Sequence, residues 1–195
     1  MPSFDEAYYR RFYGSKKTRV STPEQVGHLC AGVVGMVRWF GGDLGTVLDV
    51  GAGVGLWRDW FKKHARGVKY RSTEISDYAC ATYGHEKRDI ATWRARERFD
   101  LVVCQGVLPY LSDEDASAAL ENLAAMTRGF LYLEAITARD LESVCDRELT
   151  DVSVHGRPGS FYLTRLRRSF RRVGCGLFVR KDGPLHFYEL EALDL

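Results

Sequence analysis

A stretch near residue 50 combines an acid with closely spaced glycines, a pattern typical of a nucleotide-binding turn. It reads TVLDVGAGVG over residues 46–55, with Asp49 near the end of an apolar run and glycines on alternate positions after it. The apolar run predicts a buried strand, and residues 56–65 predict the helix that follows. Glycines at such a junction let the backbone bend sharply and let a ligand come close. The stretch therefore predicts the start of a doubly wound α/β fold, where nucleotides bind.

The detail of this turn indicates which ligand it suits. In the dinucleotide fingerprint G-x-G-x-x-G, the pyrophosphate sits at the N-terminus of the helix. Here the third glycine, Gly55, comes one position early, and Leu56 stands where that fingerprint has glycine. The Asp49 carboxylate beside the turn would repel a pyrophosphate and attract a cationic group. S-adenosylmethionine (SAM), which carries an ammonium and a sulfonium, is a ligand of that kind.

The segment from Asp49 to Gly55 resembles the first motif of the class I SAM-dependent methyltransferases, which is an acid, any residue and then G-x-G-x-G. An ordinary strand–turn–helix is the alternative interpretation of so short a match. The resemblance implies a Rossmann-like, doubly wound, mostly parallel seven-stranded sheet with an antiparallel last strand and leading helices. It also implies a methyltransferase of the EC 2.1.1 class with SAM as cofactor. In this motif it assigns SAM binding to Asp49, Gly51, Ala52, Gly53 and Gly55.

Two later segments extend the resemblance to the adenosine end of SAM. A second predicted strand ends at Glu74, which follows the third glycine by 19 residues. In a βαβ unit that distance suits an acid on the ribose hydroxyls, although a surface glutamate at a strand end is the simpler alternative. Ile75 would offer an apolar face to the adenine. Asp89 and Ile90 follow a short third strand, and the resemblance implies that Asp89 accepts from the adenine amino group.

The segment FDLVVCQGVL, residues 99–108, resembles the family's fourth strand and the loop after it. The resemblance implies that the backbone near Gln105 and Gly106 lies beside the methionine amine of SAM. In the loop that follows, Tyr110 stands where the family often has a histidine.

A general base is optional for methyl transfer from a sulfonium, because much of the acceleration can come from alignment of the reacting atoms. The candidates for such a base are Tyr110, His155 and Glu134. Each has a simpler interpretation, as a packed tyrosine, a solvated loop histidine and a structural glutamate at a strand end.

Length and composition fit one domain with a single core. The chain has 195 residues, of which 45% are hydrophobic and 28% charged, and its net charge of +2 gives no strong attraction to nucleic acid as a whole. Five scattered cysteines without C-x-x-C spacing indicate reduced thiols rather than a disulfide framework or a zinc site. The sequence opens on acidic and aromatic residues, and its most apolar helix candidate is too short and too polar to span a bilayer. We therefore expect a cytoplasmic protein without a membrane segment and without a metal.

The local patterns divide a single methyltransferase domain over residues 1–195 into leading helices over 1–42 and a SAM-binding α/β core over 43–195. Within the core, a polar stretch with two glycines and a proline, residues 146–160, predicts a loop or short lid.

The leading part carries a face of aromatic rings. Phe4, Tyr8 and Phe12 recur every four residues and so lie on one side of a predicted helix. A capping box over Thr22–Gln25 predicts the start of the second helix. In the family, such leading helices often lie over the cofactor and shape the substrate entrance, although packing on the core is the simpler role for these rings.

The end of the chain carries a dense basic cluster. Apolar residues at helical spacing predict an amphipathic helix over 163–173. Strands over 177–180 and 186–192, joined by a turn at 181–184, predict a final hairpin. Five arginines from Arg165 to Arg172 lie on this predicted helix. They indicate either an RNA-binding face or, more simply, the solvated side of the helix.

The ring-bearing leading helix and the loop over 146–160 are the segments outside the sheet with the length to cover a pocket. A pocket walled by rings with a few polar groups suits a small, mostly apolar substrate. We therefore predict methyl transfer to an O, N or C nucleophile of a small molecule. The alternatives are an RNA or protein methyltransferase that uses the arginine helix, and a non-catalytic SAM-binding protein. The sequence leaves the substrate and the oligomeric state open.

Overall fold

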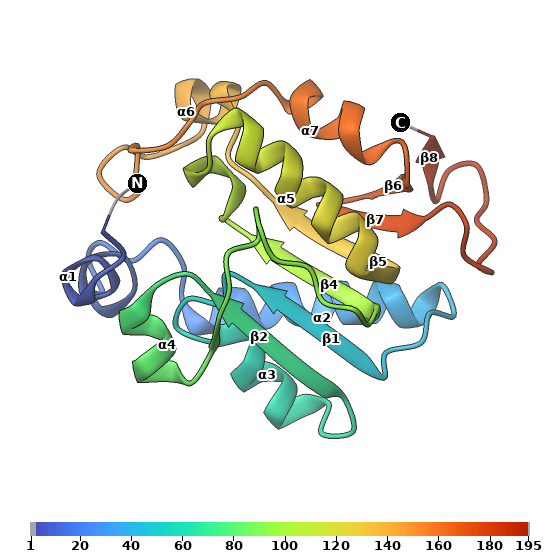
Figure 1. The fold of residues 1–195 in the computed structure, drawn as a ribbon, viewed down its shortest axis with the longest axis horizontal. Helices are drawn as coiled ribbons and strands as arrows, with labels where there is room; N and C mark the ends of the chain where they lie inside the picture. Colours follow the sequence, from blue (N-terminus) through green and yellow to red (C-terminus); the bar gives the residue numbers. More distant parts are fainter. Residues whose placement is uncertain (1–2, 195) are drawn as a thin grey trace.

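An eight-stranded β-sheet runs through the middle of the molecule (Figure 1). The computed structural model describes residues 3–194. The strand order across the sheet is β3-β2-β1-β4-β5-β7-β6-β8. In chain order the strands are β1 (Thr46–Val50), β2 (Lys69–Glu74), β3 (Glu86–Lys87), β4 (Phe99–Gln105), β5 (Thr127–Glu134), β6 (Phe170–Gly174), β7 (Leu177–Arg180) and β8 (Leu193–Asp194).

Six of these strands run in one direction. β1 pairs in parallel with β2 and β4, β2 pairs in parallel with β3, and β4 with β5. β7 is antiparallel to both β5 and β6, so β6 shares the direction of the first five strands. The two-residue β8 adds an antiparallel edge beyond β6. The predicted fold class is confirmed, and β8 is an eighth strand that the sequence did not indicate.

Helices connect the strands and cover both faces of the sheet. They are α1 (Glu6–Tyr9), α2 (Pro23–Trp39), α3 (Leu56–His64), α4 (Asp77–Tyr83), α5 (Asp113–Met126), α6 (Ala138–Ser143) and α7 (Gly159–Leu166). A π-helical turn, η1 (Arg10–Gly14), continues α1, and a 3-10 turn, η2 (Leu108–Tyr110), follows β4. The predicted capping box at the start of α2 is confirmed, because Thr22 and Gln25 each accept a hydrogen bond from the other's backbone N–H.

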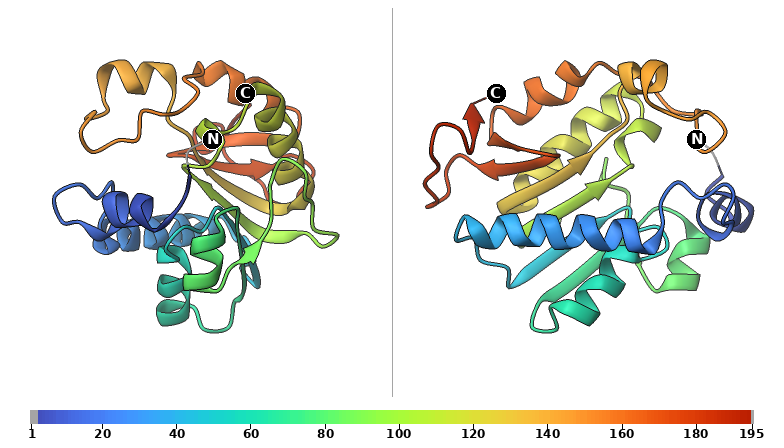
Figure 2. Two further views of the ribbon diagram at one scale, coloured as in Figure 1. Left: turned by 60° about the vertical axis from the view of Figure 1, so that its left-hand side comes forward. Right: turned by 180° about the vertical axis from the view of Figure 1, so that it is seen from behind.

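Alternate side chains of the central strands point into two separate cores. On one face, Val102 and Leu131 pack with the buried side chains of α5 and α7. On the other face, Leu101 and Phe130 pack with those of α2 and α3. Figure 1 shows α5 and α7 in front of the sheet, and the view from behind in Figure 2 shows α2 in front. Because its strands are covered on both faces, the parallel part of the sheet needs continuous apolar runs such as that of β4.

The end of the chain differs from the prediction. The helix predicted over 163–173 is wrong in extent, because α7 ends at Leu166 and the next element is the strand β6. Apolar residues at these positions fit a strand that buries Phe170 as well as a helix, and the turn after β6 decides between the two. Cys175 has a φ of +47° and Gly176 a φ of +78°, and such left-handed residues form the tight turn of a hairpin between β6 and β7.

The strand predicted over 186–192 is also wrong, because those residues form turns and loop. Phe187 packs against the core beside Phe40, but Tyr188 and Leu190 are 81% and 96% exposed, so the segment lacks the alternating burial of a strand. The arginines from Arg165 to Arg172 consequently lie partly on α7 and partly on β6 rather than along one helix. Among the helices of residues 3–194, none combines the length and the apolar character that crossing a membrane requires.

Candidate functional site

The glycine turn between β1 and α3 has the left-handed backbone that its sequence predicts. Gly51, Gly53 and Gly55 have φ angles of +69°, +56° and +81°. The N–H groups of Gly51 and of the next residue, Ala52, both donate to the Thr73 carbonyl, at 2.9 and 3.0 Å, which ties the turn to the end of β2. A Cβ at residue 51 would collide with a side chain of the loop after β4, so glycine alone fits there.

The peptide groups of Gly53 are held on both sides. Its N–H donates to Glu74 Oε2 at 2.9 Å, and its carbonyl lies 3.0 Å from His85 Nε2. A carbonyl only accepts, so Nε2 carries a proton, and His85 Nδ1 lies 2.8 Å from Ser72 Oγ. Burial lowers the pKa of His85, which favours the neutral ring at neutral pH. His85 was missed by sequence reasoning, because a histidine after a helix carries no motif.

Glu74 lies at the end of β2, as predicted, and its carboxylate is buried. Oε1 accepts from the N–H groups of Ile75 and Ser76, at 2.7 and 3.1 Å. The carboxylate faces a cavity of about 120 Å³ near the first leading helix. The cavity brings together the predicted adenosine-binding residues with several rings, and its lining includes Glu74, Ile75, Asp89, Ile90, Arg88, Phe4, Tyr8, Tyr9 and Tyr13.

Asp49 lies beneath the turn and is 2% exposed. Burial raises the pKa of this carboxyl to about 7, since desolvation disfavours its charged form. The Tyr70 hydroxyl, which donates to Asp49 Oδ2 at 2.5 Å, opposes that rise, and the negative charge of Glu74 adds to it. An acid in this state gains from a cation placed beside it, because the cation favours ionisation.

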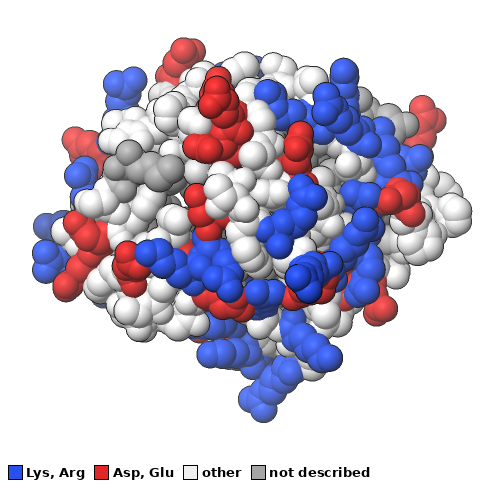
Figure 3. All heavy atoms as spheres, in the orientation of Figure 1, with Lys and Arg blue, Asp and Glu red and all other residues white. Residues whose placement is uncertain are grey.

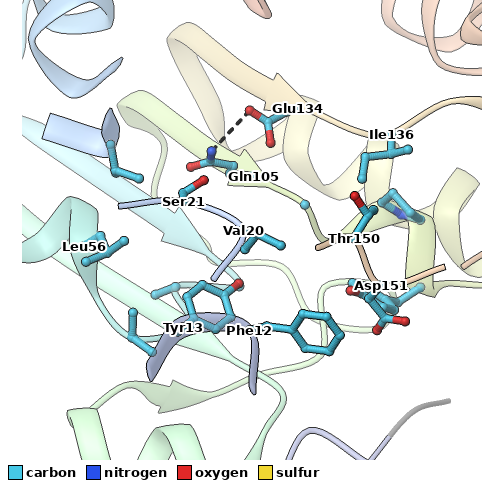
Figure 4. A pocket seen from close by; sticks show the side chains of 18 of the residues that line it. Phe12, Tyr13, Val20, Ser21, Leu56, Gln105, Glu134, Ile136, Thr150 and Asp151 are labelled. Atoms are coloured by element: carbon cyan, nitrogen blue, oxygen red, sulfur yellow. Dashed lines mark hydrogen bonds between the residues drawn. The ribbon is translucent and has the colours of Figure 1, made fainter. Parts of the chain in front are cut away.

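A chain of hydrogen bonds fixes the polar side chains at the ends of β4 and β5. Trp57 Nε1 donates to Gln105 Oε1 at 2.8 Å, and Gln105 Nε2 donates to Glu134 Oε2 at 3.2 Å (Figure 4). The Tyr132 hydroxyl donates to the same Glu134 oxygen at 3.1 Å. The Gln105 amide is thus held with its oxygen toward α3 and its nitrogen toward β5. Trp57, on the helix after the turn, was not predicted as part of the site.

The leading segment covers the site through aromatic contacts. The hydroxyls of Tyr8 and Tyr110 lie 2.9 Å apart, and Phe4 packs edge-on against both rings at 5.0 and 5.1 Å. Ser76 Oγ donates to the Phe4 carbonyl at 2.5 Å, which anchors the start of the segment to the end of β2. These contacts join α1 to the loop that follows β4, and they close the site on the side away from the sheet.

A second cavity, of about 300 Å³, continues from the first beyond the glycine turn. The two share the turn glycines Gly51 and Gly53, the pair Gln105 and Gly106, and Tyr110. Figure 4 shows its far wall, made by the leading segment, the end of β5 and the loop after α6. That wall consists of Phe12, Val20, Ser21, Glu134, Ile136, Leu149, Thr150, Asp151 and Val154.

The predicted cofactor residues come together around these two cavities, with one exception. Asp49 and Ala52 line the larger cavity. Gly55 lines neither; it is the left-handed residue before α3, and its N–H donates to the Ala52 carbonyl at 2.8 Å. Its part in the turn is therefore conformational.

The three candidate bases differ in position. Tyr110 lines both cavities, but burial raises its pKa, so the phenol stays protonated and is a poor base at neutral pH. Glu134 lines the larger cavity. The structure does not bring His155 into either cavity, because its side chain is exposed and its N–H donates to the Pro109 carbonyl at 2.7 Å.

A buried arginine holds the loop after α6 against the site. Arg157 is 3% exposed, and its Nε donates to Asp113 Oδ1 at 2.7 Å. Its two other nitrogens donate to the carbonyls of Leu108 and Leu111, on either side of Tyr110. Its contacts could not be read from the sequence, because one arginine in a polar loop has no pattern. Within residues 3–194, no group of three or more His, Cys, Asp and Glu side chains is arranged to hold a metal ion.

Comparison with known proteins agrees with this geometry. A family model described as a methyltransferase domain matches residues 6–194. Comparison with the curated proteins finds no match.

Solved structures of methyltransferases share the fold. Magnesium protoporphyrin IX methyltransferase (ChlM) from Synechocystis PCC 6803 with bound SAM has 21% identity and a TM-score of 0.56, over 90% of each chain. The sugar N-methyltransferase KedS8 from Streptoalloteichus sp ATCC 53650 has 15% identity and a TM-score of 0.63, over 89% of this chain and 91% of that one. The plantazolicin methyltransferase BpumL, in complex with a pentazolic desmethylPZN analog and S-adenosylhomocysteine (SAH), has 15% identity and a TM-score of 0.57, over 73% and 60%.

The bound SAM and SAH of these structures agree with the cofactor that the sequence predicts. The family match covers nearly the whole chain, and the mostly parallel sheet and the glycine turn are those that the resemblance implied. This chain therefore belongs to the methyltransferase domain family, within the class I SAM-dependent methyltransferases.

Proposed function

We propose that this methyltransferase moves the methyl group of SAM to an O, N or C nucleophile of a small molecule. One observation carries the proposal. The glycine turn opens into a cavity of about 300 Å³ whose far wall is built from the leading segment and the loop after α6. A cofactor on the turn and an acceptor against that wall would lie side by side, because both cavities share Gln105, Gly106 and Tyr110.

The residues around the turn fit SAM. The Glu74 carboxylate accepts three backbone N–H bonds and still faces the smaller cavity, where it suits the ribose hydroxyls. Ile75 and Ile90 give that cavity apolar surface for a purine, and Asp89 gives it an acceptor. Asp49, half-ionised near neutral pH, suits the cationic methionine end.

When bound, SAM supplies an electrophilic methyl group on a sulfonium, which is a good leaving group. The chain's own task is to hold the acceptor in line with that methyl and to keep water out. Such alignment is worth up to about 7–11 kcal/mol in favourable cases. Tyr8 and Tyr110 serve this task as neutral phenols, each able to donate and accept a hydrogen bond at the roof of the cavity.

The shape of the acceptor side supports a small molecule over a polymer. Its wall comes from three separate segments around a cavity of about 300 Å³, and apolar side chains such as Phe12, Ile136 and Leu149 contribute much of it. The neighbouring structures are named for magnesium protoporphyrin IX, a sugar and plantazolicin, which also favours acceptors of limited size.

The RNA alternative depends on the arginines from Arg165 to Arg172. Arg165 stacks on the ring of Phe161, at 3.7 Å from its centroid, and donates to Ser117 at 3.0 Å, so this arginine is engaged within the protein. Figure 3 shows Lys and Arg over a broad part of the face that it draws, with Asp and Glu among them. Such mixed charge is ordinary for a solvated surface.

Labelled-methyl transfer from SAM into a cell extract tests the proposal. The extract is separated into small-molecule, RNA and protein fractions after the reaction, and SAM and SAH binding is measured separately by calorimetry. We expect the label in the small-molecule fraction. Label confined to RNA or protein would refute the substrate class, and tight SAM binding without transfer into any fraction would favour a non-catalytic binding protein.

A further inference from the structure

The larger cavity is acidic. Together with Asp49, the charged side chains that line this cavity are Glu134 and Asp151, and among residues 3–194 no Lys, Arg or His lines it. The whole chain carries 28 Lys and Arg against 26 Asp and Glu, and many of its cations lie on the outer face drawn in Figure 3. The charge of the side chains that line the cavity is therefore negative, although the net charge of the whole chain is +2.

The ion pairs found among residues 3–194 include none of these three acids. Asp49 and Glu134 accept hydrogen bonds from uncharged side chains, and Asp151 Oδ1 accepts from the N–H of Ser153 at 2.9 Å. Carboxylates without cationic partners around a bounded cavity create a negative potential, which favours a cationic occupant.

The three acids occupy different parts of the cavity. Asp49 lies under the glycine turn, on the side proposed for the methionine end of SAM, and Glu134 belongs to the far wall where it binds Gln105. Asp151 comes from the loop after α6 and lies away from Gln105 and Glu134 in Figure 4. It lines the same cavity as Tyr8 and Tyr110, and its charge contributes to the raised pKa of both hydroxyls.

The wall around Asp151 suits a cation with an apolar body. Phe12, Val154 and Ile136 line the same cavity and offer it apolar surface. The neutral phenol of Tyr110 can accept a hydrogen bond from an ammonium group. A carboxylate, two phenols and a phenyl ring thus surround one end of the acceptor side.

We propose that the acceptor of this enzyme is a small molecule that carries a basic amine on an apolar or ring-sized body, and that Asp151 recognises the amine. The inference rests on the proposed function, because it assumes that the larger cavity holds the methyl acceptor.

The chemistry of an amine acceptor agrees with the charge of the cavity. The ammonium form first gives one proton to solvent, and the nitrogen lone pair then forms the N–C bond to the methyl group. The C–S bond breaks and leaves its electron pair on sulfur, so the positive charge moves from sulfur to the methylated nitrogen. Carboxylates on the acceptor side stabilise the charge where it arrives. An anionic acceptor, such as a carboxylate or a phenolate, would instead be repelled by Asp151.

Calorimetry on the SAH-saturated protein tests the inference without turnover. The probes are matched by body and differ in charge: 2-phenylethylamine, 2-phenylethanol and phenylacetate, with cyclohexylamine, cyclohexanol and cyclohexanecarboxylate as a second set. Benzyltrimethylammonium separates the effect of charge from that of hydrogen bonding. We expect the amines to bind at least about tenfold more tightly than the alcohols in one set or both, and the carboxylates to bind most weakly.

Asp151→Asn removes the charge and keeps nearly the same shape. It should reduce the preference for amine over alcohol about tenfold while leaving SAH affinity unchanged. Glu148→Gln is the matched control, because Glu148 is an exposed acid of the same loop that does not line the cavity. This control should keep both the preference and the SAH affinity.

The outcomes separate this inference from the proposed function. Normal SAH binding with equal affinity for amine and alcohol, or a preference for carboxylates, would overturn the amine acceptor and leave the methyltransferase assignment in place. An amine preference that survives Asp151→Asn would overturn the role of Asp151. Failure to bind SAH at all would overturn the proposed function and, with it, this inference.

Discussion

Affinity for SAM is expected to rise with pH through Asp49. This carboxyl is buried with a pKa of about 7, so near neutral pH only about half of the molecules carry the charge that meets a cation. The ammonium of a bound SAM favours the ionised form, and binding at low pH must therefore expel a proton. Asp49→Asn removes the titration and keeps an oxygen that can accept from Tyr70.

The size of the effect follows from the pKa. With a value of about 7, about a tenth of the Asp49 carboxyls are ionised at pH 6 and about nine-tenths at pH 8. SAM affinity should therefore rise about tenfold over this interval, or about 1.4 kcal/mol. In Asp49→Asn the affinity should be weaker at pH 8 and should lose this dependence.

The stability of the free protein should change in the opposite direction. Because the pKa of Asp49 is raised from its ordinary value of 3.8, the protonated form stabilises the fold, and that stability is fully present below about pH 4. It is lost as the pH rises through 7, and it amounts to at most about 4 kcal/mol. Asp49→Asn should consequently raise the Tm of the free protein at pH 8 while it weakens SAM.

Calorimetry with SAM from pH 6 to 8 and thermal unfolding over the same range check both signs. Tyr70→Phe provides a second variant: losing the hydrogen bond to Asp49 raises the carboxyl's pKa further, so the rise in affinity should move to higher pH. Burial lowers the pKa of His85, which favours its neutral ring. A wild-type affinity that is flat between pH 6 and 8, or an unchanged slope in Asp49→Asn, would refute the reasoning.

Three further predictions concern the parts around the turn. Glu74→Ala leaves three backbone N–H groups without their acceptor. We therefore expect the free energy of unfolding to fall by about 2–4 kcal/mol in denaturant unfolding, and SAM binding to weaken by about 1.5–3 kcal/mol in calorimetry. Unchanged SAM affinity would contradict the ribose role. His85→Ala should weaken SAM about tenfold by freeing the Gly53 carbonyl, and His85→Gln, whose amide can donate, should recover part of the loss; equal affinities in both variants would contradict this positioning. Deletion of residues 1–20 should abolish turnover and weaken SAM while circular dichroism still shows the folded sheet, and full activity after deletion would reduce the leading rings to packing.

The cofactor side of the site was predictable because it follows from local sequence. The turn needs residues with a left-handed backbone, and glycines adopt that conformation without strain. The spacing of Gly51 and Gly53 therefore identifies the turn from the sequence alone. Parallel strands place their carboxyl ends at one edge, so an acid such as Glu74 at the end of the second strand meets the turn of the first. The pairing register between β1 and β2 then brings the Glu74 carboxylate to the N–H of Gly53.

Residues that act through long-range contacts could not be predicted in this way. His85 reaches the carbonyl of Gly53 across 32 residues, and Trp57 reaches Gln105 across 48. The sequence alone does not distinguish the role of either residue from that of an ordinary ring packed in the core. The end of the chain failed for another reason, because the spacing of Leu166, Phe170 and Val173 fits a helix, and the hairpin became evident only from the backbone at Cys175.

The loop after α6, on the acceptor side, is a second place where the sequence does not tell which side chain faces the cavity. His155 and Asp151 stand four residues apart in a segment without regular structure, so no periodicity tells which side chain faces the cavity. The answer comes from the C-terminal end of the loop, where the N–H of His155 donates to the Pro109 carbonyl and Arg157 donates to the carbonyls on either side of Tyr110. With those points held, the segment that includes Asp151 lies over the cavity and His155 stays outside.

The two halves of the site are joined by the leading segment. Tyr8 lines both cavities, and its hydroxyl meets that of Tyr110, which also lines both. An acceptor that contacts this pair therefore contacts side chains that also line the cofactor cavity, and a bound cofactor would contact the same pair. The hydrogen bond between the two phenols and the ring of Phe4, which packs edge-on against both, hold this pair in place.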